Sequence, residues 1–152
     1  MVAAAVERST AVLVGRERRP LPTNPRLTRM REWRDQLAQG SIVWARIPDP
    51  RGLIKRRPVV ILTDAGEIVL NGPIVGVAVT TSFPDPPPRI YVELPCHSRG
   101  HPATRLTRRS AAVCNWLVQL QPSDVEEIKG VVPTQTMLSI VNRVRELNTP
   151  SR

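Results

Sequence analysis

Residues 40–60, GSIVWARIPDPRGLIKRRPVV, decide the fold class of this chain. They open with a short segment of alternating character, run into a polar loop rich in proline and glycine, and end in Arg-Pro followed by an apolar run. A period of two is typical of a strand with one buried face, whereas proline and glycine clusters mark the turns between strands. The stretch therefore predicts two strands joined by a loop.

The same pattern continues beyond this stretch, because short apolar runs alternate with turns rich in proline and glycine. Strands are expected over Ile42–Ile47, Pro58–Thr63, Ile74–Thr81, Ile90–Leu94 and Ala111–Leu120. This spacing predicts a barrel or a compact twisted sheet. In the first strand Trp44 shares a face with Ile42 and Arg46, so it is interpreted as a core or interface anchor rather than a base-stacking platform.

The C-terminal part is expected to be helical. Ser123 with Glu126 forms a capping-box pattern, which predicts a short helix that ends at Gly130. A second helix is expected after Pro133, with its apolar residues on one stripe that packs on the barrel. That stripe consists of Met137, Ile140, Val141, Val144 and Leu147.

Residues 1–39 read as an arginine-rich N-terminal extension, and residues 148–152 as a short tail. Pro20, Pro22 and Pro25 interrupt regular structure between an apolar start and the next helix-like stretch, so residues 1–25 are predicted to be disordered. An amphipathic helix is predicted over residues 27–38, from apolar residues at three- and four-residue spacing: Leu27, Met30, Trp33 and Leu37. Met30 is an alternative start of the chain.

With 152 residues, of which 41% are hydrophobic, the chain fits one domain whose core needs neither disulfides nor metal. No apolar run approaches the length of a membrane span and no secretory signal is recognised, so a cytoplasmic location without a membrane partner is expected. Cys96 and Cys114 lie in different segments, so no disulfide framework is expected. Cys114 is interpreted as a small buried hydrophobe.

The formal net charge of +9 attracts polyanions, and in the cytoplasm the commonest polyanion is nucleic acid. Of the 22 basic residues only Lys55 and Lys129 are lysines. An excess of arginine suits bidentate phosphate contacts, but G+C-rich coding also produces it, and both explanations stay open.

Two further blocks stand beside the opening stretch: VAVTTS at Val77–Ser82 and SAAVCNWLVQL at Ser110–Leu120. Together the three blocks resemble the MazF/PemK toxin family, over roughly residues 40–147. The resemblance implies a mainly β fold, an SH3-like small β-barrel with C-terminal helices, assembled as a homodimer. It also implies a toxin of a type II toxin–antitoxin pair, whose partner is a cognate antitoxin with a disordered segment that covers the active groove.

The activity that the resemblance implies is cleavage of single-stranded RNA without a metal ion or other cofactor. The ribose 2′-OH attacks the adjacent phosphorus and leaves a 2′,3′-cyclic phosphate and a free 5′-OH. Arg57 matches the family arginine of Arg-Pro-Val and suits the phosphorane charge, since a guanidinium holds two phosphate oxygens in one fork. Thr80 matches the family threonine, and a shift of one residue would place Thr81 in the groove instead.

Several residues depart from the family pattern. Asn115 stands in the family's Asp position, Val113 and Val118 replace arginines, and the loop from Pro50 to Lys55 carries no acidic or histidine residue. Asn cannot act as a general base, and loss of a positioned acid–base group lowers a rate by roughly 10²- to 10⁴-fold. The alternative function is therefore a barrel that binds RNA or a protein without cleaving. A third, CcdB-like action on DNA gyrase has no positive support in the sequence.

His97 and His101 are the only histidines and share one loop, where they are candidate proton shuttles or simply solvated residues. With Cys96 they invite a zinc interpretation, but a fourth ligand is missing and the spacing fits no usual structural site. The remaining candidates are RNA-binding residues, for which solvation without a role stays an alternative. They are Arg51, Lys55, Arg56, Arg105, Arg108, Arg109 and Asn115.

Overall fold

The computed structural model describes residues 36–68 and 72–148. The strands are β1 (Ser41–Pro48), β2 (Ile54–Ile61), β3 (Ile74–Thr80), β4 (Tyr91–Leu94), β5 (Ser110–Leu120) and β6 (Val125–Val131). Two 3-10 turns, η1 (Ala65–Glu67) and η2 (Pro122–Asp124), precede β3 and β6, and the helix α3 (Thr134–Asn148) closes the described chain. No helix in these two ranges is long and apolar enough to span a membrane.

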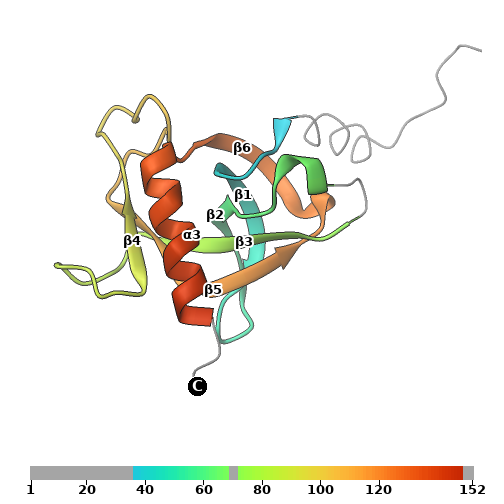
Figure 1. Ribbon diagram of the computed structural model, residues 1–152, viewed down its shortest axis with the longest axis horizontal. Coiled ribbons are helices and arrows are strands. Elements are labelled where there is room, and N and C mark those ends of the chain that lie inside the picture. The colour runs from blue at the N-terminus through green and yellow to red at the C-terminus, as the bar shows by residue number, and fades with distance from the viewer. Residues whose placement is uncertain (1–35, 69–71, 149–152) are drawn as a thin grey trace, which may run out of the picture.

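The strands form one antiparallel sheet in the order β4-β5-β3-β2-β1-β6, and α3 lies across one face of it (Figure 1). The expected mainly β fold with a C-terminal helix is confirmed. Closure into a barrel is not confirmed, because within the described ranges no ladder joins the outer strands β4 and β6. The sheet is therefore an open one with two edges.

Two apolar clusters lie on opposite faces of the sheet. Adjacent residues of β2 divide between them: Val60 belongs to the cluster under α3, whereas Val59 belongs to the cluster on the other face. Successive side chains of a strand point to opposite faces, which explains the division. We call these clusters the helix-side core and the opposite core. The apolar stripe of α3 packs on the helix-side core as predicted, with Met137 and Ile140 buried.

An irregularity in β5 changes which face its residues cover. Val79 pairs with Ala112 but Val77 pairs with Leu117, so β5 advances five residues while β3 advances two. As a result Cys114 joins the helix-side core, whereas Trp116, also even-numbered, packs against the opposite core. A bulged strand re-aims its side chains in this way. The interpretation of Cys114 as a buried hydrophobe is confirmed, since the residue is fully buried.

Two glycines mark places where backbones approach closely. A Cβ on Gly76 would lie 2.6 Å from Val59 Cγ1 and 2.7 Å from the carbonyl oxygen of Val60. A Cβ on Gly130 would collide with the carbonyl oxygens of Ala103 and Thr104, which belong to the loop before β5. Gly130 therefore allows this loop to lie against β6.

The short helix predicted after Ser123 is wrong, because the chain forms η2 and then β6. The observed capping box joins Gln121 and Asp124, with the Gln121 N–H donating to Asp124 Oδ2 at 2.8 Å. The following residues pair with the exposed side of β1, where Val125 lies opposite Ala45. Pairing along a free strand edge outweighs a local helix signal that spans about two turns.

The loop expected from Pro50 to Lys55 is shorter in the structure. Asp49 closes it: one carboxylate oxygen accepts the N–H groups of Arg51 at 2.8 Å and Leu53 at 2.9 Å. Lys55 already lies in β2 opposite Ile47. The segment 1–25, which was predicted to be disordered, lies outside the described residues. The same holds for residues 27–35 of the predicted helix 27–38 and for the tail after residue 148.

Candidate functional site

A groove of about 340 Å³ opens where β1, β2 and β3 meet the segment that leads into β5. We call it the basic groove. Its lining consists of Trp44, Arg56, Arg57, Pro58, Val79, Thr81, Leu106, Thr107, Arg108, Ser110 and Lys129. Four of these residues are cationic, and the lining contains no carboxylate and no histidine. A surface of this composition attracts anions.

Trp44 supplies the aromatic surface of the basic groove. The ring is half-buried and belongs to neither core, so the core half of its predicted role is wrong, whereas a role as an interface anchor stays a prediction. The Arg56 guanidinium lies 4.4 Å from the ring centroid, and the Lys129 ammonium lies 5.7 Å away. Both distances are within the range of a cation–π interaction. Trp44 thus presents a ring framed by two cations.

Arg56 is neutralised by β6. Its Nε and one terminal nitrogen donate to Glu126 and Glu127, each at 2.9 Å. The partners are partly exposed, so such pairs contribute at most about 1 kcal/mol each to stability. Their effect on the groove is to fix the guanidinium over Trp44 and to cancel its charge.

Thr81, and not Thr80, lines the basic groove. The Thr80 hydroxyl is engaged locally, where it accepts the Ser82 N–H at 3.1 Å. Thr81 lies directly after the end of β3, two residues beyond Val79, and both residues line the groove. Of the two neighbouring threonines that the sequence offered as candidates, Thr81 and not Thr80 therefore lies beside the groove cations.

Arg57 contributes to the groove wall, but its guanidinium lies on another aromatic ring. It is 5.3 Å from the ring centroid of Trp116, which is not a groove residue. Arg57 Nε is buried and has no hydrogen-bond partner among the described residues. A buried unpaired donor is uncommon and favours an anionic or carbonyl acceptor.

Arg108 and Lys129 complete the charge of the basic groove. Neither forms an ion pair with any residue in 36–68 or 72–148, and Arg108 is exposed. Together with Arg57 they are the groove cations that no described carboxylate neutralises. The arrangement suits a phosphate ester, whose oxygens accept hydrogen bonds from guanidinium and ammonium groups.

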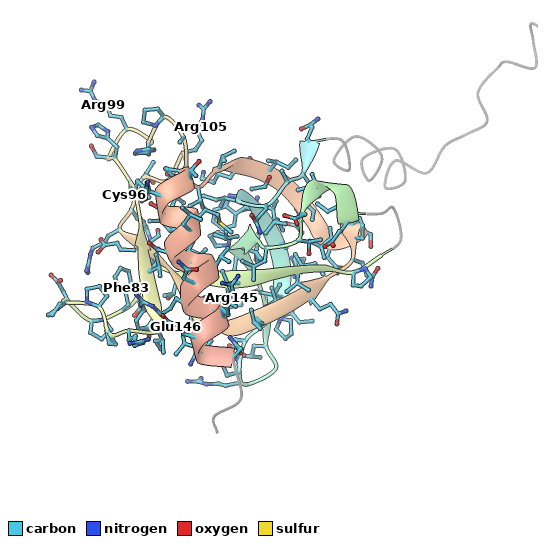
Figure 2. The ribbon with its side chains drawn as sticks, in the orientation of Figure 1. Phe83, Cys96, Arg99, Arg105, Arg145 and Glu146 are labelled. Atoms are coloured by element: carbon cyan, nitrogen blue, oxygen red, sulfur yellow. The ribbon has the colours of Figure 1, made fainter. Side chains whose placement is uncertain are left out.

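The other predicted RNA-binding residues lie outside the basic groove. Arg51 and Lys55 belong to the β1–β2 hairpin, and Asn115 is exposed in the irregular part of β5. Arg105 extends outward from the loop before β5, near Arg99 (Figure 2).

Arg109, also predicted to bind RNA, is held by carboxylates. It bonds Glu93 at 2.8 Å and Asp85 at 3.3 Å, and it stacks on Phe83 at 4.3 Å. The hydrogen bond that Arg109 donates to Glu93 raises the pKa of Arg109. Arg109 is thus a structural partner of β4 rather than a free cation.

The two histidines hold the shape of their loop. His97 Nδ1 accepts the Arg99 N–H at 3.1 Å, and His101 Nδ1 accepts the Ala103 N–H at 3.0 Å. Neither residue lines the basic groove. No group of three or more His, Cys, Asp or Glu residues in the described part of the chain has a metal-binding arrangement.

Lys129 and Thr107 were missed at the sequence level. Lys129 lies in the segment that was predicted as a short helix, so its position beside Trp44 was hidden by the wrong secondary structure. The strand β6 places it there through the ladder with β1, in which Glu127 lies opposite Trp44. Thr107 gave no recognisable signal, because an isolated threonine in a loop is common.

Residues 38–147 match a family model described as the PemK-like, MazF-like toxin of type II toxin–antitoxin systems. The chain belongs to this toxin family. Most of the chain is covered by the match, and every residue of the basic groove lies inside it. No curated protein matches the sequence significantly.

Solved structures share the fold of this PemK/MazF-like toxin. MazF from Deinococcus radiodurans is 19% identical with a TM-score of 0.59, over 73% of this chain and 94% of that chain. MazE–MazF from the same organism is also 19% identical, with a TM-score of 0.58, and the match covers 76% of this chain and 98% of that chain. An endoribonuclease in complex with its cognate antitoxin, from a mycobacterial species, is 14% identical with a TM-score of 0.58, over 76% and 99%. At these identities the likeness is one of fold.

Proposed function

We propose that this PemK/MazF-like toxin is an endoribonuclease that cleaves single-stranded RNA in the basic groove. One observation carries the proposal: cations that no described carboxylate neutralises lie beside an accessible tryptophan ring and a threonine hydroxyl in one groove. Proteins that bind single-stranded nucleic acid combine a cationic path for the backbone with aromatic rings on which bases stack. Membership of the toxin family and the fold shared with an endoribonuclease support the same activity.

Substrate binding divides between the charged and aromatic parts of the groove. Arg108 and Lys129 hold phosphate oxygens, and a base stacks on the Trp44 ring. Stacking on an aromatic side chain contributes about 1–3 kcal/mol per base. Single strands are favoured over duplexes because only an unpaired base has a free face for Trp44.

The proposed reaction is an internal transesterification. The 2′-oxygen forms a bond to phosphorus while the bond from phosphorus to the 5′-oxygen breaks, giving a 2′,3′-cyclic phosphate and a 5′-OH. The proton lost by the 2′-OH is balanced by the proton gained by the 5′-oxygen. Thr81 orients the reacting ribose or phosphate by its hydroxyl, and Arg57 stabilises the charge that develops on the phosphorane.

The basic groove has no side chain suited to proton transfer near neutral pH. Its lining has no carboxylate and no imidazole, so the protons exchange with water rather than with a positioned side chain. Positioned acid–base groups contribute about 10²- to 10⁴-fold in rate. We therefore expect cleavage to be slow, with charge stabilisation and orientation supplying most of the acceleration.

The second candidate function is RNA binding without cleavage. The same lack of an acid–base residue in the groove favours it. The two candidates differ in one outcome, because both predict salt-sensitive binding but only the first predicts new RNA ends.

The experiment is incubation of the purified full-length protein with a long single-stranded RNA in EDTA, followed by mapping of the 5′ ends. Discrete cuts with 5′-OH ends are expected, and Arg57→Ala is expected to abolish them. Arg99→Ala is the matched control, because Arg99 is an exposed arginine outside the groove. Intact RNA with salt-sensitive binding would replace the first candidate by the second.

We also propose a cognate antitoxin, homodimeric assembly and a cytoplasmic site of action. The antitoxin segment would be acidic and would compete with RNA for the basic groove, since both ligands neutralise the same cations. Growth arrest on induced expression, relieved by the antitoxin, is the expected result in cells. Unimpaired growth without antitoxin would contradict the toxin role.

A further inference from the structure

One wall of the basic groove comes from the loop that joins β4 to β5. Leu106, Thr107 and Arg108 of this loop line the groove, and we call residues 106–108 the groove wall. Leu106 is buried in the helix-side core, whereas Thr107 and Arg108 are exposed. The position of this short segment therefore decides where the Arg108 charge lies in the groove.

The turn directly before the groove wall is organised by the side chain of His101. Its Nδ1 atom accepts the N–H of Ala103 at 3.0 Å and the N–H of Thr104 at 3.3 Å. A side chain that captures the N–H groups two and three residues ahead fills the role that Asn and Asp usually have in turns and caps. Nδ1 fills this role only while it carries no proton. We call residues 101–105 the His101 turn.

Hydrogen bonds tie the His101 turn to the groove wall. The His101 N–H donates to the Leu106 carbonyl oxygen at 3.2 Å, and the Leu106 N–H donates to the Thr104 hydroxyl at 3.1 Å. The same hydroxyl donates to the Pro95 carbonyl oxygen at 2.8 Å, directly after β4. Thr104 is fully buried. The position of the wall therefore depends on the shape of the turn.

The His101 turn is also fastened to β6. The Val131 N–H donates to the Ala103 carbonyl oxygen at 2.9 Å, and Gly130 leaves room for this oxygen where a Cβ would collide with it. The strand β6 carries Lys129, which lines the groove together with Arg108. The turn thus fixes how these two cations lie relative to each other.

The backbone of Arg105 shows that the turn is constrained. Its φ of 62° lies in the left-handed region, which residues with a Cβ rarely adopt. Such a conformation persists only where the surrounding contacts fix it. The Arg105 N–H donates to the His101 carbonyl oxygen at 2.8 Å, and the His101 side chain holds the two residues before Arg105. Without the Nδ1 acceptor, we expect the turn to relax and the groove wall to move with it.

From these contacts we infer that His101 is a positioning residue of the basic groove, whose unprotonated Nδ1 keeps Arg108 where it meets an RNA phosphate. The inference rests on the proposed RNA-binding function. His101 does not line the groove, so it acts through the turn and the wall, and not by proton transfer to the substrate.

The test compares His101→Ala with His101→Asn. The amide oxygen of Asn accepts N–H groups, whereas Ala offers no side-chain acceptor. The affinity for single-stranded 2′-O-methyl RNA, in which the nucleophile is blocked, is measured by fluorescence anisotropy well below the unfolding temperature of each variant. His101→Ala is expected to weaken binding by about tenfold and His101→Asn by less than about twofold, because only the first leaves the turn N–H groups without an acceptor.

Two comparisons separate positioning from stability. His97→Ala removes the other histidine of the loop, whose Nδ1 accepts the Arg99 N–H outside the wall, and it is expected to bind RNA as the wild type does. In a double-mutant cycle with Arg108→Ala, His101→Ala is expected to cause little further loss, because its effect passes through Arg108. A substitution that only destabilised the fold would lower the unfolding midpoint and leave the affinity of the folded protein unchanged.

Amide hydrogen exchange reports on the wall without any RNA. The N–H groups of Leu106 and Val131 are both bonded to the His101 turn. They are expected to exchange faster in His101→Ala than in the wild type, and at the wild-type rate in His101→Asn and His97→Ala, since local opening exposes these N–H groups to water.

Each outcome decides between the claims. If His101→Asn loses as much affinity as His101→Ala, or if exchange at Leu106 is unchanged in His101→Ala, the inference is overturned. If His101→Ala binds RNA as the wild type does while Arg108→Ala binds weakly, the role of His101 is wrong and the RNA-binding function stands. If the wild-type protein binds no single-stranded RNA, the proposed function fails and the role of His101 in RNA binding fails with it.

Discussion

Arg56 and Arg57 are neighbours on β2, yet their guanidinium groups lie on two different tryptophans. Arg56 stacks on Trp44 at 4.4 Å, and Arg57 stacks on Trp116 at 5.3 Å. Because consecutive side chains of a strand point to opposite faces, one arginine pair reaches both sides of the sheet. Among the described residues, carboxylates neutralise only Arg56 of this pair, at Glu126 and Glu127. The two arginines therefore have separate roles, one structural and one available for an anionic ligand.

Lys129 is expected to contact RNA phosphate, whereas Lys55 is not. Lys129 lies in the basic groove beside Trp44, and Lys55 is exposed on the hairpin outside it. Lys129→Ala should weaken single-stranded RNA binding and reduce the slope of log K against log salt by roughly 0.7. Lys55→Ala is the matched control in a salt titration of binding. Equal effects of both substitutions would mean that general charge, not the groove, binds RNA.

Removal of the carboxylates on β6 is expected to strengthen RNA binding. Glu126→Gln with Glu127→Gln frees the charge of Arg56 at the groove while leaving Trp44 in place. The gain should be a fewfold rise in affinity at low salt, since the charges are partly exposed and screened. Asp64→Asn with Glu67→Gln, at η1 and outside the groove, removes the same two charges elsewhere and should have a smaller effect. Unchanged affinity in the double variant would show that Arg56 does not face the ligand.

Gly76→Ala is expected to destabilise the fold. Its added Cβ would lie 2.6 Å from Val59 Cγ1 and 2.7 Å from the carbonyl oxygen of Val60, so β2 and β3 must separate. Overpacking of this kind typically costs about 1–3 kcal/mol in the free energy of unfolding. Gly66→Ala is the control, since its Cβ meets nothing within 4 Å. Chemical denaturation of both variants measures the difference, and equal midpoints would contradict the close strand approach.

Cys114 is expected to resist thiol reagents that modify Cys96. Burial raises the pKa of the Cys114 thiol to about 11, and the residue is fully buried. At pH 8 this thiol therefore stays protonated, and only the thiolate reacts. Cys96 is half-buried and should react in the native protein. Titration with a chromogenic disulfide should give one thiol per native chain and two after denaturation. Rapid reaction of native Cys96→Ser would contradict the burial of Cys114.

The sequence predicted the strands and the final helix well, because their signals are local. Alternation identifies β1, and the stripe that includes Met137 and Ile140 identifies α3. The strand β6 was missed because its spacing resembles a helix and its pairing with β1 is a long-range contact. That error concealed Lys129.

The candidate site was predictable in part. Resemblance pointed to Arg57 and to a threonine at the end of β3, but only the strand register chooses Thr81 over Thr80. Trp44 was interpreted as a core or interface anchor, because the alternation of a single strand does not reveal that its face opens into a groove. The position of Trp116 on the opposite core depends on the irregular ladder between β3 and β5, and an extra run of residues in one strand is invisible in a single sequence.

The central claim, RNA cleavage in the basic groove, is tested most directly by the adjacent threonines. Single-turnover cleavage of single-stranded RNA in EDTA would be measured for the wild type, Thr81→Ala and Thr80→Ala. Thr81 lines the groove, whereas the Thr80 hydroxyl bonds Ser82. We expect Thr81→Ala to lower the rate by about tenfold or more and Thr80→Ala to change it less than twofold, as one oriented hydrogen bond is lost only in the first. Equal rates for the two variants, or no cleavage by the wild type, would contradict the account.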